Sequence, residues 1–261
     1  MNVVIGLVNK PTTKPIREQV SAAEWQARVD LAACYRLVAH YRWDDLIFTH
    51  LSIRVPGEDG HFLINPYGMM FHEITASSLV KIDLDANIVL SNGYGVNRAG
   101  FTIHSAVHSA RHDAMCVMHL HTADGAAVSA QREGLLPLSQ TSMVVLASLA
   151  YHDYEGGALN LDERSRIVAD FGDKTSMILR NHGTMTVGGT VAEAFTRMWF
   201  LERACNIQVR ALAGNRDVVA ASQAAQDTVK QQIKENGGMA AQTAWPALIR
   251  MLDSKYPDFR D

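Results

Sequence analysis

The stretch Met118-His119-Leu120-His121-Thr122 decides how this chain is organised. Val117 and Met118 lead an apolar run into it, as expected for a buried strand. Residues two apart on a strand point to the same face of its sheet, so His119 and His121 lie side by side at the strand end. Two neighbouring imidazoles on one face make half of a metal site.

A second apolar run, Met177-Ile178-Leu179, ends in Arg180-Asn181-His182-Gly183. Gly183 lets the backbone turn sharply, so we expect His182 to be delivered at the end of a strand. A third imidazole would complete a three-histidine site that leaves coordination positions open for a substrate. The alternative is that these histidines are hydrogen-bonded polar residues of the core, and spacing alone supports the two interpretations equally.

A rival metal constellation lies on the helix expected over Gly100 to Ala110. His104, His108 and His112 follow one another at a spacing of four residues, and two histidines four apart on a helix can bind zinc. The glutamate that follows the first histidine in zinc-protease helices is replaced by Ser105. We therefore expect these histidines to line the helix face near the site or the surface.

Length and composition exclude several classes of protein. A chain of 261 residues can bury a sizeable core and is compatible with one large α/β domain. Its formal net charge of −3 provides no basic surface for nucleic acid or an anionic membrane. We expect a cytoplasmic location, because no apolar run is long enough to span a bilayer and no signal-peptide segment opens the chain. Cys34, Cys116 and Cys205 are scattered among apolar neighbours, which predicts buried thiols rather than disulfides.

The chain divides into an N-terminal arm over residues 1–20, a domain over 21–215 and a helical tail over 216–261. Ser21 stands three residues before Glu24, a capping-box spacing that starts a helix. The Gln-, Ala- and Lys-rich tail is expected to be solvated and to help form an oligomer. The alternation of helices and strands predicts an α/β fold with a mixed sheet. The expected elements include a helix ending at Trp43, a hairpin of Ile47–Val55 with Phe62–Ile64, a short helix over Ile74–Val80 with Thr75 as its N-cap, a strand over Val80–Leu84, and helices over Ala123–Gln131 and Val191–Leu212.

Several motifs resemble those of the class II aldolase/adducin family, in the same order and over about residues 22–215. The resemblance implies a three-layer α/β/α fold with a central mixed, largely antiparallel sheet, and tetramers with active sites at subunit interfaces. It also implies a divalent metal, with zinc expected and manganese or iron as alternatives, held by His119, His121 and His182. The motifs are Gly95-Val96-Asn97-Arg98-Ala99-Gly100-Phe101-Thr102-Ile103-His104-Ser105-Ala106, His119-Leu120-His121-Thr122, Ala150-Tyr151-His152-Asp153-Tyr154 and Leu179-Arg180-Asn181-His182-Gly183.

The chain departs from the sugar-phosphate aldolases of this family where they bind phosphate. Those enzymes carry phosphate-binding serines and an acid/base glutamate before the family helix, whereas this chain has Asn97-Arg98-Ala99-Gly100. A phosphate-binding asparagine of the family is replaced by His50. The substrate is therefore not expected to be a phosphorylated sugar, and the chain is closer to the adducin head around Asn97 to Ala106 and Ala150 to Tyr154.

We expect Arg98, His50 and Gly68 to bind the substrate. The guanidinium group of Arg98 matches a carboxylate in bidentate fashion, so we expect a small-molecule carboxylate to replace the phosphate. The alternative is that Arg98 forms an ordinary structural ion pair. His50 is a second basic neighbour of the expected metal, and Gly68 belongs to the turn at Asn65–Gly68.

Three residues are candidates for proton transfer. Glu73 is the nearest substitute for the missing glutamate, and its alternative role is to cap a turn or remain in solvent. His152 and Tyr154 lie in sequence between the segments that carry the expected metal ligands. We expect the turns after the strands, with His182 among them, to meet at one edge of the sheet.

The expected activity is that of a metal-dependent lyase, because a divalent ion stabilises the enolate that cleavage of a carbon–carbon bond leaves behind. Loss of the aldolase glutamate favours decarboxylation of a small hydroxylated or keto carboxylate over retro-aldol cleavage. One alternative is a non-haem iron(II) oxygenase that acts on an aromatic keto or hydroxy acid. Another is a non-enzymatic assembly module like the adducin head. The chain ends soon after the head region and lacks adducin's long tail, which favours a stand-alone bacterial enzyme.

Overall fold

The structure, a computed structural model, describes residues 14–97, 100–156, 162–214, 217–236 and 239–261. Within these ranges, eight strands form one sheet in the order β4-β3-β2-β1-β5-β8-β7-β6. Each neighbouring pair is antiparallel except β6 and β7, which are parallel, so the predicted mixed, largely antiparallel sheet is confirmed. The strands are β1 (His50–Arg54), β2 (His61–Ile64), β3 (Val80–Asp83), β4 (Ile88–Leu90), β5 (Cys116–Leu120), β6 (Leu149–His152), β7 (Ser176–Leu179) and β8 (Gly183–Gly188).

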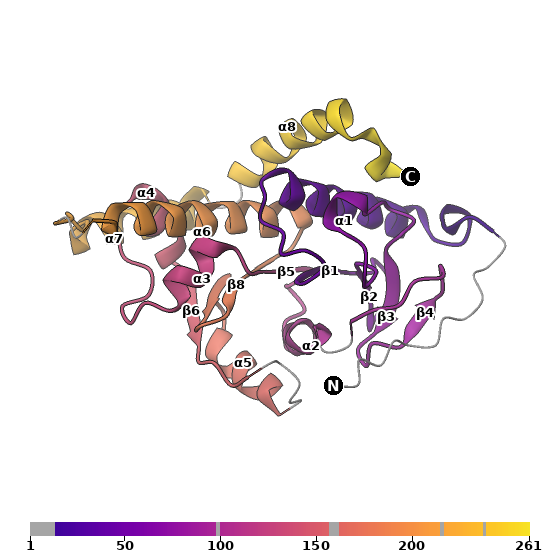
Figure 1. Cartoon of the computed structure of the whole chain (residues 1–261), viewed down its shortest axis with the longest axis horizontal. Helices are drawn as coiled ribbons and strands as arrows, with labels where there is room; N and C mark the ends of the chain where they lie inside the picture. Colours follow the sequence, from indigo (N-terminus) through magenta and orange to yellow (C-terminus); the bar gives the residue numbers. More distant parts are fainter. Residues whose placement is uncertain (1–13, 98–99, 157–161, 215–216, 237–238) are drawn as a thin grey trace.

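Helices cover both faces of the sheet, which confirms the predicted three-layer α/β fold (Figure 1). One face carries α1 (Ala22–His40) and α6 (Val191–Leu212), with α3 (Ala123–Ser129) and α4 (Gln140–Leu146) packed on α6. The other carries α2 (Phe101–Ala110) and α5 (Glu163–Phe171). The predicted helix over Val191–Leu212 is confirmed at both ends, and the predicted helix over Gly100 to Ala110 corresponds to α2.

The side chains of β5 alternate between two separate cores. Met118 and Leu120 point into the core beneath α1 and α6, whereas Val117 belongs to the core on the side of α2 and α5. His119 is therefore on the same face as Val117, because residues two apart share a face. Cys34, Cys116 and Cys205 are free thiols and all three are buried, as predicted.

A buried charge cluster joins α1 to β3. The Ser21 hydroxyl caps the helix by accepting the Glu24 amide at 3.1 Å, as the sequence predicts. The Glu24 carboxylate pairs with Arg28 at 2.9 Å and with Lys81 of β3 at 2.9 Å, and it is almost fully buried. Buried charges are tolerated only when paired in this way.

The short helix predicted over Ile74–Val80 is wrong. The chain instead forms a 3₁₀ helix, η2 (Phe71–Glu73), followed by a turn in which Thr75 and Ser78 exchange side-chain and backbone hydrogen bonds. Arg28 donates to the carbonyl oxygens of Ala76 and Leu79. These oxygens therefore accept hydrogen bonds from a buried guanidinium group and not from the backbone amides of a helix.

Two predicted boundaries also differ from the structure. Helix α1 ends at His40 rather than at Trp43, because Arg42 adopts a left-handed conformation with φ of 59°. Strand β1 begins at His50 rather than at Ile47, because Leu46 and Thr49 also have positive φ angles.

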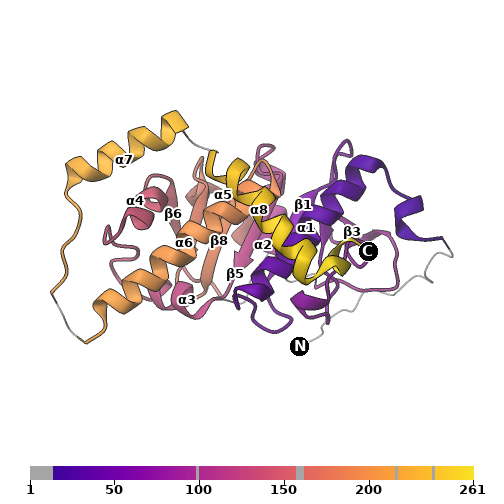
Figure 2. The same cartoon turned by 90° about the horizontal axis from the view of Figure 1, so that it is seen from above.

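The C-terminal region is helical but not solvated throughout. It contains α7 (Gln223–Asn236), α8 (Met239–Lys255) and the 3₁₀ helix η3 (Pro257–Arg260). Helix α8 crosses over α1 and α6 (Figure 2), and its Leu252 is fully buried together with Phe259 of η3. Of the helices within the described ranges, none has both the length and the apolar character needed to cross a membrane.

Candidate metal centre

The turn between β7 and β8 carries His182 to the end of β5. It is tight, because the His182 amide donates to the Leu179 carbonyl at 3.1 Å. The residue with positive φ is Asn181, at 54°, and not Gly183 as the sequence suggested. Gly183 is needed for space, because a Cβ atom there would lie 2.3 Å from the Leu120 carbonyl oxygen. The absent side chain lets the hairpin approach the end of β5.

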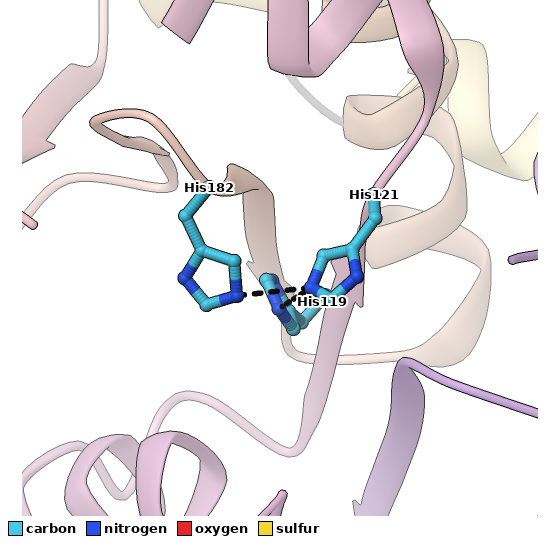
Figure 3. A group of neighbouring side chains, drawn as sticks. All are labelled: His119, His121 and His182. Atoms are coloured by element: carbon cyan, nitrogen blue, oxygen red, sulfur yellow. Dashed lines mark hydrogen bonds between the residues drawn. The ribbon is translucent and has the colours of Figure 1, made fainter. Parts of the chain in front are cut away.

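The imidazoles of His119, His121 and His182 point toward one another (Figure 3). The Nε2 atom of His121 lies 2.9 Å from Nε2 of His119 and 2.9 Å from Nε2 of His182. Each pair of ring centroids is 4.7 Å apart. The structure thus brings together the three histidines that the sequence predicts as ligands.

Hydrogen bonds at the opposite ring nitrogens determine what these Nε2 atoms can do. Nδ1 of His119 lies 3.1 Å from the Thr184 carbonyl oxygen, and Nδ1 of His121 lies 3.2 Å from the Asp45 carboxylate. Carbonyl and carboxylate oxygens accept hydrogen bonds, so each Nδ1 carries the hydrogen and each Nε2 of a neutral ring is a bare lone pair. Metal-binding histidines are oriented by such partners.

This donor set fits a divalent metal ion. Lone pairs on nitrogens 2.9 Å apart repel one another unless a cation lies between them. The three Nε2 donors lie within 4.8 Å of one another, close enough for one ion to bind all of them. Burial and the neighbouring histidines lower the pKa of His119 well below its usual value, and the same causes lower the pKa of His182 to about 4. Neutral imidazoles are the form that binds metal.

His50 lies beside this cluster on the neighbouring strand. It pairs with His119 across β1 and β5, and the two ring centroids are 5.6 Å apart. Its Nδ1 is 2.9 Å from Nε2 of His104 on α2. A Cβ atom on Gly100, at the start of α2, would lie 2.2 Å from Nε2 of His50, so only glycine admits the ring here.

The rival constellation on α2 is engaged elsewhere. His104 and His108 both hydrogen-bond to the hydroxyl of Ser52 on β1, at 2.6 and 2.8 Å, and both are buried. His112 lies beyond the end of α2 and is exposed. Within the described ranges, one group of three or more possible ligands is close enough to hold an ion, and it consists of His119, His121 and His182.

Tyr154 and His152 have different relations to the cluster. Tyr154 is 57 % exposed, and its ring centroid lies 6.2 Å from that of His182. His152 is buried at the end of β6, where its Nδ1 lies 2.7 Å from Asp170. Its Nε2 is 3.4 Å from Glu163, a distance suited to an ion pair but too long for a good hydrogen bond. His152 therefore fastens the edge strand to α5.

The remaining predicted residues lie outside the cluster or outside the described ranges. The Glu73 carboxylate accepts the Met70 amide at 2.7 Å and is exposed, as in the capping alternative. Gly68 adopts a positive φ of 100° in the loop that follows β2. Arg98 lies outside the residues that the structure describes.

The sequence reasoning did not single out Asp45, Thr184 and Ser52. Asp45 is far from His121 in the chain, and Thr184 contributes only its carbonyl oxygen, so neither leaves a signal in the sequence. Ser52 follows His50 by two positions on one strand. The alternation of side chains on that strand was a signal that they share a face.

Comparison with known proteins places this chain among class II aldolases and adducins. Residues 29–209 match the family model described as the class II aldolase and adducin N-terminal domain. A Caulobacter vibrioides protein named "Putative aldolase class 2 protein" is 61% identical over 250 residues, which cover 95% of this chain and 97% of that protein.

The chain is also similar to a solved bacterial structure and to part of a mouse adducin. The crystal structure of an aldolase II superfamily protein from Pseudomonas syringae has a TM-score of 0.91 and 52% identity, and the match covers 95% of this chain and 100% of that one. Alpha-adducin from Mus musculus is 50% identical over 189 residues, which are 71% of this chain but 26% of the adducin.

Proposed function

Because this chain belongs to the class II aldolase and adducin family, we propose that it is a metal-dependent carbon–carbon lyase whose substrate is a small hydroxylated or keto carboxylate. The observation that carries the proposal is the convergence of three Nε2 atoms, two of them fixed as bare lone pairs by hydrogen bonds at Nδ1. Decarboxylation is favoured over retro-aldol cleavage, because it requires no strong base to remove a hydroxyl proton first.

His119, His121 and His182 are the proposed ligands of the metal, with zinc expected. When bound, a divalent ion supplies positive charge that stabilises the enolate left by cleavage of the carbon–carbon bond. Three protein ligands leave room for the substrate in the coordination shell. Asp45 and the Thr184 carbonyl hold two of the imidazoles in the tautomer that binds metal.

Residues around the ligands are proposed to bind the substrate and to move a proton. The phenol of Tyr154 is exposed beside His182, and we propose that it donates a proton to the product. Arg98 is proposed to bind the substrate carboxylate as a bidentate partner. His152 is proposed to position Tyr154 by holding the end of β6 against α5.

Metal content is the first test of the proposal. We expect about one zinc per chain in the purified protein, and at least about tenfold weaker zinc affinity in the His119→Ala variant. The control is His112→Ala, which removes an exposed histidine remote from the ligands. Release of carbon dioxide from a panel of hydroxy-aromatic and keto acids should depend on the metal and be equal with and without oxygen.

Other results of this test lead to other functions. Bound iron with oxygen uptake would identify an oxygenase. If the protein bound no metal and showed no turnover, both enzyme functions would be contradicted. We expect the subunits to form a homotetramer with active sites at the subunit interfaces. Light scattering measures the number of subunits.

A second candidate function is a binding module like the adducin head. The 50% identity to mouse alpha-adducin over 71% of this chain favours it. Such a module requires no turnover, so metal binding without activity on any carboxylate of the panel would support it against the lyase.

A further inference from the structure

A chain of hydrogen bonds runs from the core to His50, beside the proposed metal ligands. Nδ1 of His108 lies 3.1 Å from the Ala114 carbonyl oxygen, and its Nε2 lies 2.8 Å from the Ser52 hydroxyl. The same hydroxyl lies 2.6 Å from Nδ1 of His104, whose Nε2 lies 2.9 Å from Nδ1 of His50. His104, His108 and Ser52 are at most 1 % exposed, so water does not replace any of these bonds.

The direction of this chain is set at its buried end. A carbonyl oxygen only accepts, so Nδ1 of His108 must carry the hydrogen that it shares with Ala114. Burial, with Arg54 nearby, lowers the pKa of His108 to about 3, so the ring is neutral and its Nε2 is a bare lone pair. The Ser52 hydroxyl must therefore donate to His108, which leaves its oxygen as the acceptor for His104.

The same rule passes from ring to ring. His104 donates through Nδ1 to Ser52, so its Nε2 has no hydrogen and accepts from His50. His50 must then carry its hydrogen on Nδ1, and its Nε2 is a lone pair. No ion pair of the described residues involves His50, so no carboxylate there favours a second proton.

The free lone pair belongs to the ring that neighbours His119, one of the proposed metal ligands. Nε2 of His50 lies against Gly100 at the start of α2, and the hydrogen bond of His50 to another described residue is made through Nδ1. The ring centroid of His119 is 5.6 Å from that of His50. Any side chain at position 100 would collide with this nitrogen, so glycine leaves it uncovered on that side.

We infer that the chain from Ala114 through His108, Ser52 and His104 fixes His50 as a hydrogen-bond acceptor for the substrate, and therefore selects a substrate that presents a hydroxyl group rather than a keto oxygen. This inference rests on the proposed function, because it chooses between the two carboxylate classes named there. Ser52, His104 and His108 are positioning residues, and His50 is the residue that touches the substrate.

The tautomers are measured directly by long-range proton–nitrogen NMR on the full chain with nitrogen-15-labelled histidine and bound zinc. We expect the hydrogen on Nδ1 in His50, His104 and His108, with signals assigned from single His→Gln variants. A hydrogen on Nε2 of any of the three in the wild type would overturn the inference. This measurement is made on the wild-type protein and does not depend on enzymatic turnover.

The Ser52→Ala variant tests whether the hydroxyl sets the direction. Without its acceptor, His104 is expected to carry its hydrogen on Nε2 and donate to His50, which then becomes an Nε2 donor. Ser52→Thr keeps a hydroxyl and should retain the wild-type tautomers. The matched control is Ser105→Ala, which removes a buried hydroxyl on α2 that bonds only to Thr102 within the helix. Unchanged tautomers in Ser52→Ala would overturn the inference.

Ligand selection is tested by calorimetry with glycolate and methoxyacetate, which differ by a methyl group on the hydroxyl oxygen. We expect the zinc-loaded wild type to bind glycolate more tightly than methoxyacetate. The ratio of the two dissociation constants should fall by about threefold to tenfold in Ser52→Ala, because one hydrogen bond contributes about that much to affinity. An equal preference in both proteins, or no binding of glycolate, would overturn the assignment of the hydroxyl. Predicted tautomers and glycolate preference without release of carbon dioxide would instead contradict the proposed function alone.

Discussion

Replacing Glu202 by glutamine should change how the stability of this protein depends on pH. Glu202 lies on α6 behind the end of β5, and it is 4 % exposed. Its carboxylate accepts hydrogen bonds from the hydroxyls of Thr122 and Thr184, the latter at 2.9 Å. Burial outweighs these bonds and raises the pKa of Glu202 to about 7 from a usual value of 4.5.

The size of the effect follows from this difference in pKa. Between pH 4.5 and about 7 the unfolded chain loses the Glu202 proton while the folded protein keeps it. The free energy of unfolding therefore falls as the pH rises, by up to about 1.4 kcal/mol per pH unit. Above about pH 7 both states are ionised, and the accumulated loss is about 3 kcal/mol. Below pH 4.5 both are protonated, and Glu202 has no effect on the pH dependence.

Glutamine has the same shape, stays neutral and can still accept from a threonine hydroxyl. The free energy of unfolding of Glu202→Gln minus that of the wild type should rise by about 3 kcal/mol between about pH 4.5 and pH 8. Urea titrations at several pH values measure it. The control is Thr196→Ser, which removes no titratable group from α6. Its free energy of unfolding minus that of the wild type should not change with pH. A flat difference for Glu202→Gln would refute the reasoning.

Two further predictions concern a close backbone contact and a buried charge. Gly183→Ala places a Cβ atom 2.3 Å from the Leu120 carbonyl oxygen, so it should destabilise the protein by about 1–3 kcal/mol and weaken zinc binding. Urea titrations measure the loss of stability. Gly189→Ala is the control, because its Cβ atom would meet no atom closer than 3.5 Å. Glu24→Ala leaves the buried Arg28 without its carboxylate and should cost about 3–5 kcal/mol, and a loss below about 1 kcal/mol in thermal unfolding would contradict the buried charge cluster.

Local patterns in the sequence predicted an α/β fold with a mixed sheet and the pair His119 and His121, and the family resemblance added the three layers and the largely antiparallel pairing. Alternation along β5 places His119 and His121 on one side, and the apolar stripe of the helix at Val191–Leu212 sets its length. These patterns repeat within a few residues and need no knowledge of the rest of the chain. The resemblance to a known family added the third ligand, His182, with more force than its position in a turn.

The parts that were missed depend on contacts between distant segments. The helix predicted over Ile74–Val80 failed because the buried Arg28 takes the carbonyl oxygens that a helix would use. Asp45 could not be found, because its contact with His121 spans a large part of the chain. The role of Glu73 as the substitute for the family glutamate stays a prediction, and its carboxylate accepts the Met70 amide in its own turn.

The alternation along β5 also limits how this protein can change in evolution. One residue inserted or deleted between Cys116 and His121 would exchange the two faces of the strand, burying an imidazole in the apolar core and turning Met118 toward the proposed metal site. Substitutions around the centre leave this register intact. Related proteins should therefore vary in the side chains that meet the substrate, while the length of this segment stays constant.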